Sequence, residues 1–372
     1  MDSTARQAFF RDSVLLAPLT KGGNLPFRRL TVELGARITC GEMAVARFVL
    51  KGRRGEMALL RRADDEPAFG AQLAGRIPEE MADAARNAVE RGADFVDVNL
   101  GCPIDVFCRK GLGAALMRKP RKVERIVEAM RAAIDVPLSV KMRLGYDDAK
   151  PRFLEVARAC EEAGADAVTL HGRSRAQRYS RAADWDAVAT LVDRVSIPVI
   201  GNGDLLTWRD VERHRHHTGC AGVMLARGAL IKPWLFREIA DRRDHLLGPQ
   251  ARLDVLRRYR ALALAHFGDD ERGRRRVHEF LHWHLDFFNR YRPVPSDTVD
   301  PDAHPLLQTR AAAVETDDET TRLLYSTDPD DRTALTDRIM GEIDDDPESL
   351  ALWSSRSASS ILDRPEGVSV SP

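Results

Sequence analysis

"AFGAQLAGRIPEEMADAARNAVERGADFVDVNLGC", residues 68–102, contains two short apolar runs joined by an amphipathic segment. The joining segment, residues 78–93, places its apolar residues at the spacing of one helix face. The flanking runs are nearly continuously apolar, which is typical of parallel strands buried on both faces of a sheet. The stretch therefore predicts a strand, a crossover helix and a second, parallel strand.

The same pattern recurs from residue 14 to residue 230, with helix-like segments such as residues 122–136 between the apolar runs. The eight predicted strands are residues 14–19, 36–43, 68–75, 95–102, 138–145, 167–173, 197–204 and 222–230. Eight strand–helix units predict an α/β protein with a closed (β/α)8 barrel, a TIM barrel. A doubly wound sheet is the alternative, but no G-x-G-x-x-G motif follows the first strand.

After residue 232 the predicted elements are helices. The predicted helices are residues 233–247, 251–268 and 274–292. The last two carry apolar residues at helical spacing, with arginines on the other faces. We therefore expect a barrel domain over residues 1–232 and a small all-α domain over residues 233–295. Residues 296–372 are expected to form an acidic, largely disordered tail, with short helices possible at residues 317–326 and 332–343.

The formal net charge is zero, but charge is distributed unevenly along the chain. Residues 296–372 contain 18 Asp and Glu against 6 Lys and Arg, which leaves 51 basic and 39 acidic residues in residues 1–295. A basic body is compatible with a polyanionic partner, although a solvated surface gives the same pattern.

The composition also indicates the cellular compartment of the protein. Five cysteines are few for 372 residues and favour reduced thiols over a disulfide framework. No apolar run approaches the roughly 18 residues that span a bilayer, and the first residues lack the apolar core of a signal peptide. We expect a soluble, cytoplasmic protein.

In a barrel of this kind the active site lies at the carboxyl ends of the strands. The polar residues at those ends are Thr20, Lys21, Glu42, Gln72, Asn99, Cys102, Lys141, Arg143, His171, Arg173, Asn202, Asp204 and Arg227. Each has a structural alternative: Lys141 as an ion-pair partner, His171 as a core histidine, Gln72 as a strand-end cap. Their joint placement favours an active site.

Two loops predict a phosphate site. Residues 201–204 and 226–230 follow the last two predicted strands, where barrels of this type often bind phosphate. Gly203 and Gly228 allow a close backbone approach, and Arg227 can add a charge-assisted contact. On the neighbouring strands, Lys141 can hold negative charge on a reduced ring and Gln72 offers a donor and an acceptor to a ring edge.

Five segments occur together and in order: "VNLGCPIDVFCRKGLGAALM" (98–117), "VKMRLG" (140–145), "LHGRSRAQRY" (170–179), "GNGD" (201–204) and "MLARGALIKPWLF" (224–236). With them, residues 13 to 292 resemble the tRNA-dihydrouridine synthases. "TCGEMAV" (39–45) and "LHGRSRAQRYSRAADW" (170–185) are most similar to the branch that contains the eukaryotic enzyme for position 47. The resemblance implies an FMN-binding barrel followed by a helical tRNA-binding domain.

The resemblance also implies roles for single residues. Cys102 would be the general acid. The flavin ring would lie against Pro18, Leu19 and Thr20 and bond to Gln72 and Lys141. The ribityl phosphate would be held by His171, Asn202, Gly203, Asp204, Ala226 and Arg227. Substrate contacts would come from Asn99, Arg143 and Arg173. Leu19 and Ala226 depart from the commoner "APM" and "GRG" forms of the motifs, but neither change removes a flavin contact.

The implied reaction uses NADPH, or NADH, to reduce FMN. Hydride passes to C6 of a uridine flipped out of tRNA, and Cys102, with an ordinary pKa of about 8.5, protonates C5 to give 5,6-dihydrouridine. Phosphates of tRNA would be contacted by arginines of the helical domain: Arg257, Arg258, Arg260, Arg274, Arg275, Arg276, Arg290 and Arg292. We expect a monomer, with no membrane and no metal.

Two alternatives stay open. A flavin barrel could act on a free pyrimidine or another small molecule, and an RNA-binding protein could have lost its chemistry. A smaller question concerns the cysteines Cys102 and Cys108, which could form a disulfide or a metal site. A reduced compartment disfavours the first, and the lack of further ligands disfavours the second. We therefore expect Cys102 to act in catalysis and Cys108 only to fill space.

Overall fold

The structure, a computed structural model, describes residues 1–298, 314 and 316–341. Internal contacts divide the chain into two compact units, which are treated separately below. The first consists of Met1–Arg28, Ala36–Leu205 and Asp210–Ala226. The second contains Arg29–Gly35, Leu206–Arg209 and the chain from Arg227 onward.

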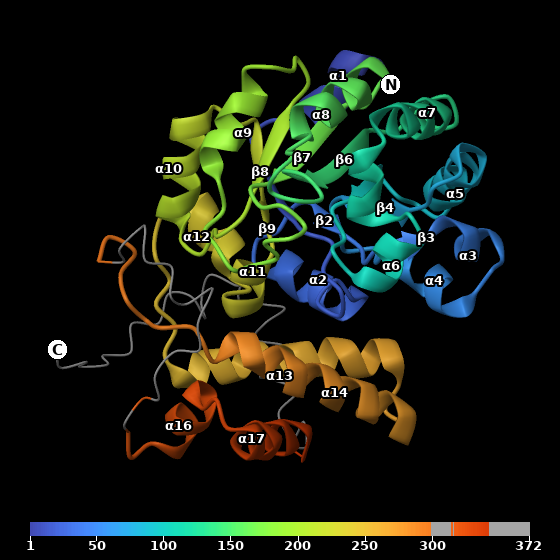
Figure 1. Cartoon of the computed structure of the whole chain (residues 1–372). Helices are drawn as coiled ribbons and strands as arrows, with labels where there is room; N and C mark the ends of the chain where they lie inside the picture. Colours follow the sequence, from blue (N-terminus) through green and yellow to red (C-terminus); the bar gives the residue numbers. More distant parts are fainter. Residues whose placement is uncertain (299–313, 315, 342–372) are drawn as a thin grey trace. The chain divides into compact units, whose positions relative to one another are not determined.

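The first unit is built on a closed, all-parallel β-barrel (Figure 1). Its strands are β1 (Ser13–Leu16), β2 (Thr39–Cys40), β4 (Phe69–Ala74), β5 (Phe95–Leu100), β6 (Leu138–Arg143), β7 (Ala167–His171), β8 (Val199–Asn202) and β9 (Gly222–Leu225). They are hydrogen-bonded in the order β1-β9-β8-β7-β6-β5-β4-β2. The ring closes where the Leu16 N–H donates to the Ile38 carbonyl at 2.9 Å, beside a bridge between Leu15 and Ile38. The predicted (β/α)8 barrel is therefore confirmed.

One small strand was not predicted from the sequence. The strand β3 (Ala44–Val45) pairs with β4 outside the main path of the sheet, and the long run predicted over residues 36–43 contains only the two residues of β2. The Glu42 carboxyl lies between these short strands, and burial raises its pKa.

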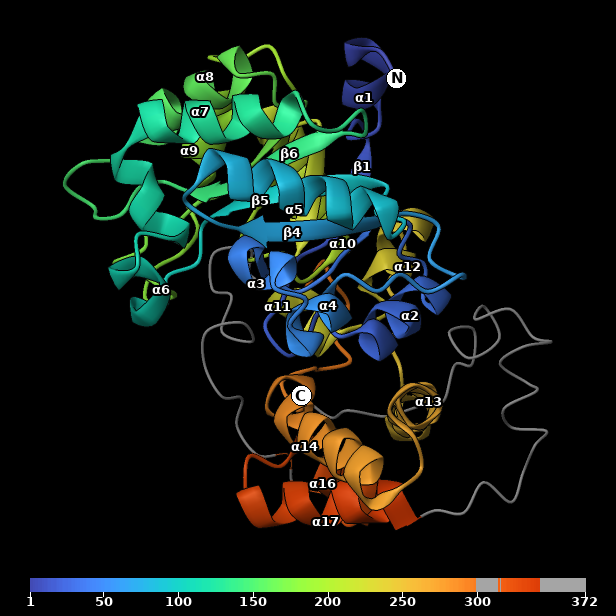
Figure 2. The same cartoon turned by 90° about the vertical axis from the view of Figure 1, so that its right-hand side faces the viewer.

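Helices surround the strands of the first unit. They are α1 (Ser3–Ala8), α3 (Ala46–Leu50), α4 (Arg54–Leu59), α5 (Pro78–Glu90), α6 (Asp105–Arg109), the 3-10 helix η1 (Gly113–Arg118), α7 (Pro120–Arg131), α8 (Phe153–Glu162) and α9 (Trp185–Val192). Two more, α2 (Leu25–Glu33) and α10 (Trp208–Thr218), contain residues of both units. Figure 2 shows α5 alongside α7, and the two helices pack together.

The sequence of α7 shows why such a segment forms a covering helix. Proline at its first position loses no hydrogen bond there, because the first N–H groups of a helix have no partner within it. Val123, Ile126, Val127 and Met130 are buried and lie three or four residues apart, so they form one apolar face. Polar residues occupy the other faces and stay in solvent.

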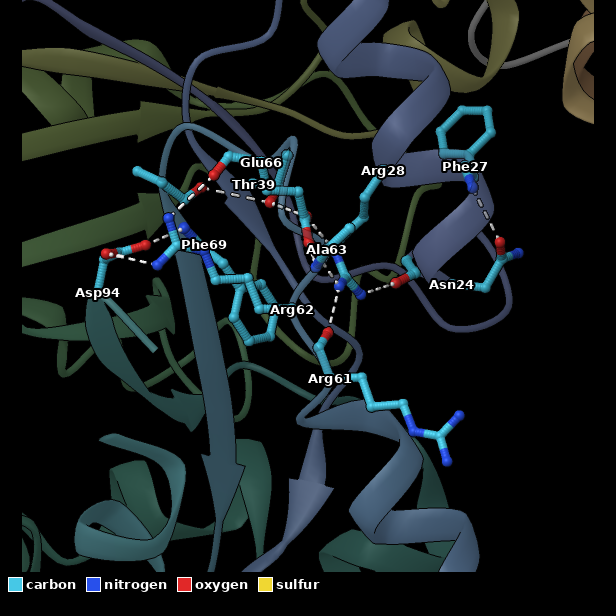
Figure 3. Close-up of polar contacts among 12 residues, drawn as sticks. Asn24, Phe27, Arg28, Thr39, Arg61, Arg62, Ala63, Glu66, Phe69 and Asp94 are labelled. Atoms are coloured by element: carbon cyan, nitrogen blue, oxygen red, sulfur yellow. Dashed lines mark hydrogen bonds and ion pairs between the residues drawn. The ribbon is translucent and has the colours of Figure 1, made fainter. Parts of the chain in front are cut away.

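A buried ion pair joins the helix α2 to the barrel wall (Figure 3). The Arg28 guanidinium donates to both carboxylate oxygens of Glu66, at 2.7 and 3.1 Å. Glu66 also accepts the Thr39 hydroxyl at 2.6 Å and the Ala63 N–H at 2.8 Å. Because neither charged group reaches solvent, each depends on the other for compensation.

The described part of the second unit is helical. Its helices are α11 (Arg227–Ile231), α12 (Leu235–Asp241), α13 (Pro249–Phe267), α14 (Glu271–Phe288), α16 (Glu319–Tyr325) and α17 (Pro329–Gly341). The pair α13 and α14 turns at Gly268, where φ is +93°. The helix α16 packs on α13, and α17 packs on α13 and α14.

The last two helices lie within the expected acidic tail, residues 296–372. α16 and α17 form at the two short segments of this tail for which helices were considered. Their apolar residues Leu323, Leu324, Leu335 and Ile339 are buried, and this burial explains why acidic segments are packed. The rest of the tail, residues 299–313, 315 and 342–372, lies outside the described residues.

Several arginines expected to contact RNA are engaged within the second unit. Arg260 is buried and donates to the Ile339 carbonyl, so its predicted phosphate contact is wrong for this conformation. Arg258 forms an ion pair with Glu33 at 2.7 Å, and Arg290 pairs with Asp286 at 3.6 Å. Sequence pattern alone does not distinguish such arginines from free ones.

Candidate active site

A hydrogen-bonded network of polar side chains crosses the strands β4, β5 and β6. The Gln72 side-chain amide donates to Asp97 at 2.7 Å, and the Ser139 hydroxyl donates to the other Asp97 oxygen at 2.6 Å. The three residues are direct neighbours in the sheet register. Asn99 then donates to the Gln72 oxygen at 2.6 Å. Asp97 thus fixes the orientation of Gln72, and burial raises the pKa of this aspartate.

Asp97 and Ser139 were not predicted. The available sign was the spacing within β5, because Asp97 lies two residues before Asn99 and therefore on the same side of the strand. Their partners lie on other strands, so the network becomes visible only when the register is known.

Lys141 lies in β6 next to this network, opposite Asn99 in the register. Its Nζ donates to the Asn202 side-chain oxygen at 3.1 Å, and Asn202 in turn donates to the Met224 carbonyl at 2.7 Å. Within the described residues no carboxylate forms an ion pair with Lys141, so the ion-pair alternative is wrong. Burial, followed by repulsion from Arg143, lowers the pKa of Lys141 to about 8. A lysine of this kind can accept a nearby negative charge.

The loop after β5 carries Cys102. The Asn99 side-chain oxygen accepts the N–H groups of Gly101 at 3.2 Å and Cys102 at 2.9 Å. The Arg143 Nε donates to the Gly101 carbonyl at 2.8 Å. Cys102 is partly exposed, and burial of the rest of its side chain raises its pKa, so the group stays a protonated thiol near neutral pH.

The second cysteine, Cys108, contacts the backbone of this loop. Cys108 is buried in α6, and its Sγ lies 3.5 Å from the Cys102 carbonyl. Both cysteines are free thiols, so the disulfide alternative is excluded. Within the part of the chain that the structure describes, no group of His, Cys, Asp or Glu side chains is arranged to hold a metal ion.

A second polar cluster follows β7 and β8. Arg173 is fully buried, forms an ion pair with Asp204 and lies 3.2 Å from the His171 Nε2. Asp204 also accepts the Ala183 N–H at 2.8 Å. A substrate contact from Arg173 would require this arginine to leave its ion pair. Arg143 is also buried, and it donates to the Ser174 carbonyl at 3.0 Å.

The backbone after β8 has an unusual conformation. Gly203 has a φ of +135° and Asp204 a φ of +51°. A Cβ on Gly203 would lie 2.5 Å from the Ala183 Cβ and 3.4 Å from the His171 ring. Only glycine fits this position, because a Cβ would overlap Ala183 and φ lies in the left-handed region. A glycine turn beside a histidine ring is the kind of backbone that can approach a phosphate closely.

The remaining predicted cofactor residues follow the first strand, β1, and the last strand, β9. Leu19 and Ala226 are partly buried and pack against a core cluster that includes Leu15 and Met224. Pro18 is half-buried and Thr20 is exposed. Arg227 begins the helix α11, as the first residue of that stretch of the second unit.

An apolar rim borders the Cys102 loop. Pro103, Ile104, Asp105, Val106, Arg178 and Tyr179 line an open groove of about 360 Å³. The Tyr179 side chain is 47% exposed, and its ring centre lies 5.9 Å from the Arg143 guanidinium carbon and 6.0 Å from that of Arg173. This rim was not predicted from the sequence. The available signal was the pair of apolar residues Ile104 and Val106, which follow Cys102 closely in the chain.

Several curated proteins are similar to this chain. The tRNA-dihydrouridine(47) synthase [NAD(P)(+)]-like protein of Xenopus tropicalis is 43% identical over 289 residues, which cover 77% of this chain and 45% of that protein. The human protein of that name is 44% identical over 288 residues, covering 76% and 44%. The rice protein is 37% identical over 363 residues, covering 96% and 52%.

This chain thus spans about half the length of the curated relatives it matches. The family described as "Dihydrouridine synthase (Dus)" matches residues 15–285, most of the chain and all the strands of the barrel except the first two residues of β1. On this match, the chain belongs to the dihydrouridine synthase family.

Proposed function

We propose that this protein reduces the C5–C6 double bond of a uridine in tRNA to give 5,6-dihydrouridine, with bound FMN and with NADPH or NADH as the reductant. Family membership and the names of its relatives support the reaction class. The observation that carries the proposal is a partly exposed thiol, Cys102, held by Asn99. Asn99 lies across the register from Lys141, which forms no ion pair within the described residues.

The residues inside the barrel suit a flavin. Gln72 and Asn202 are each oriented by a second hydrogen bond, so they offer fixed polar groups to a ring edge. Lys141 donates to the neutral side chain of Asn202 and forms no ion pair within the described residues, and its cation can hold negative charge on that ring. The glycine turn at Gly203, beside the His171 ring, would hold the phosphate of the cofactor. When bound, FMN supplies the hydride that C6 of the uracil receives.

The proton for C5 is assigned to Cys102. Hydride at C6 and a proton at C5 together saturate the double bond, and the electron pair comes from the nicotinamide reductant. Because burial raises the pKa of Cys102, the thiol keeps its proton at neutral pH until C5 accepts it. Asn99 holds the backbone of Cys102, which limits where the Sγ can lie.

A uridine must leave its stack to enter a barrel mouth. Exposed Ile104, Val106 and Tyr179 beside Cys102 offer apolar and aromatic surface to nucleobases around the extruded one. We further propose that residues 233–295 contribute to tRNA binding and that the protein acts as a monomer in the cytoplasm. Five free thiols are consistent with a reducing compartment, and no helix among the described residues has the length and apolar character that crossing a membrane requires.

Mapping dihydrouridine in the total tRNA of a strain that lacks this protein tests the proposal. We expect one or more positions to lose the modification and to regain it when the gene is restored. Unchanged dihydrouridine at every position would contradict the proposal. If the purified protein instead reduces free uracil and leaves unmodified tRNA unchanged, the small-molecule alternative is correct.

A further inference from the structure

A cluster of basic side chains lies at the amino end of α7 and beside the start of α5. Arg76 precedes α5, Lys119 precedes α7, and Lys122 and Arg125 lie in the first two turns of α7. Arg76, Lys122 and Arg125 line an open groove of about 610 Å³ between the two helices. These four residues are called the α5–α7 cluster below.

The four cations of the α5–α7 cluster outnumber the two carboxylates that line its groove. None of its four side chains forms an ion pair within the described residues, and the groove carboxylates Glu79 and Glu128 form none either. By contrast, Arg86 of α5 pairs with Asp83, and Arg62 pairs with Asp94 at 3.1 Å. Burial and then repulsion from Arg76, Lys119 and Arg125 lower the pKa of Lys122. Cations in this arrangement gain stability from an external anion.

The helix itself adds to this effect. The first turn of α7 contains no acidic residue, and no side chain caps its first N–H groups. The amino end of a helix carries partial positive charge, so it reinforces the side chains of the cluster.

The cluster is continuous with the proposed active site. Gly111 belongs to the loop that carries Cys102, and a Cβ at Gly111 would lie 3.8 Å from the Arg76 Cδ. An RNA strand with one nucleotide at Cys102 can therefore pass neighbouring phosphates over Arg76 without leaving the first unit.

We propose that the α5–α7 cluster binds backbone phosphates of the RNA substrate. The cluster is open and spread over two helices, as expected for contacts along a phosphate backbone rather than for an enclosed small anion. The proposal rests on the proposed function, since it takes the substrate at Cys102 to be RNA. It names a binding surface on the barrel in addition to the arginines of residues 233–292.

The test is the salt dependence of tRNA binding by the full chain with its flavin bound. The variant is Arg76→Ala/Lys122→Ala/Arg125→Ala, which keeps Lys119 at the start of α7. We expect a Kd at least ten times higher at low salt. The slope of log K against log salt should be smaller by about two to three, because each phosphate contact contributes roughly 0.7–0.9. The KM for tRNA should rise, with kcat unchanged at saturation.

A matched variant controls for net charge. Arg11, Arg91 and Arg194 are exposed, form no ion pair within the described residues, and precede β1, β5 and β8 at the opposite end of the strands. Arg11→Ala/Arg91→Ala/Arg194→Ala removes the same charge and should bind tRNA almost as the unaltered protein does. Thermal unfolding and flavin absorbance establish that both variants are folded.

Equal slopes and affinities for the cluster variant and the unaltered protein would overturn the proposal. So would an equal loss in both variants, because net charge would then explain the effect. Failure of the proposed function looks different: the unaltered protein would form no dihydrouridine, whatever the salt dependence of its RNA binding.

Discussion

The side-chain oxygen of Asn99 accepts the backbone N–H of Cys102 at 2.9 Å, and its amide group donates to Gln72 at 2.6 Å. One strand residue thus connects the thiol loop to the network that surrounds Asp97.

Asn99→Ala removes both contacts. We expect dihydrouridine formation to fall by about 10²-fold, since small misplacements of a reacting group have effects of that size. Ser139→Ala is the control, because it removes one hydrogen bond to Asp97 but leaves the Cys102 loop anchored. Initial rates at saturating tRNA compare the two, and equal losses would contradict a role of Asn99 in holding the loop.

Cys102→Ala removes the proposed proton donor. We expect activity to fall by about 10²- to 10⁴-fold with flavin absorbance unchanged, which is the range for general acids. Cys108→Ala should keep activity within a few-fold, since its Sγ only contacts the Cys102 carbonyl. If both variants stay active, another group protonates C5.

Lys141 predicts a pH dependence of stability. Its pKa in the folded protein is about 8, below its ordinary value of 10.5, so the unfolded chain holds this proton more tightly. The charged form is therefore destabilising below pH 8, and this effect is relieved as the pH rises from about 8 to 10.5.

Replacing the lysine isolates that effect. Lys141→Met without flavin should be more stable than the unaltered protein at pH 7, by up to roughly 3 kcal/mol. The difference should shrink by pH 10. Denaturant titrations at the two pH values measure it, and a difference independent of pH would contradict the low pKa of Lys141.

The buried pair of Arg28 and Glu66 predicts a large change in stability. Arg28→Met leaves Glu66 buried without its cation, which costs about 3–5 kcal/mol of the free energy of unfolding. Arg28→Met/Glu66→Gln should recover much of this, because no buried charge is then left without a partner. The amide oxygen can accept the Ala63 N–H, and the amide NH2 can donate to the Thr39 hydroxyl oxygen, whose own proton can go to the Ala68 carbonyl. No recovery in the double variant would show that the loss has another cause.

Substitutions at two glycines that follow Cys102 distinguish the effect of backbone strain from that of steric contact with Cys102. Gly113 has a φ of +58°, and a Cβ there would lie 2.9 Å from the Cys102 Cβ. Gly111 has a similar φ of +74°, but a Cβ there meets only Arg76 at 3.8 Å. Gly113→Ala should reduce activity at least ten times more than Gly111→Ala, with similar thermal unfolding. Equal activities would mean that the loop can move away from Cys102 without loss.

The barrel was predictable because its strands are local and nearly continuously apolar. Every residue of β4 and β5 is buried. Strands buried on both faces are mostly apolar, and such runs can be recognised in the sequence. The two-residue strand β3 was missed because so short a run has no periodicity. The residues at the strand ends followed from barrel geometry, and the resemblance assigned their roles.

What could not be predicted depends on contacts between distant residues. The hydrogen bonds of Asp97 and Ser139 could be predicted only with the register of the strands β4, β5 and β6. The burial of Arg173 beside Asp204, and of Arg260 against the Ile339 carbonyl, is likewise decided by tertiary packing. Sequence pattern therefore predicts where the site lies, while packing determines which of the nearby charged side chains are already paired.

Dihydrouridine formed by the purified protein is the most direct test of the account. The protein, FMN, NADPH and an unmodified tRNA are incubated, and the nucleosides are analysed by mass spectrometry. We predict a nucleoside heavier than uridine by two hydrogen atoms with the unaltered protein and almost none with Cys102→Ala. A flavin-loaded, folded protein that leaves every uridine unchanged would contradict the account.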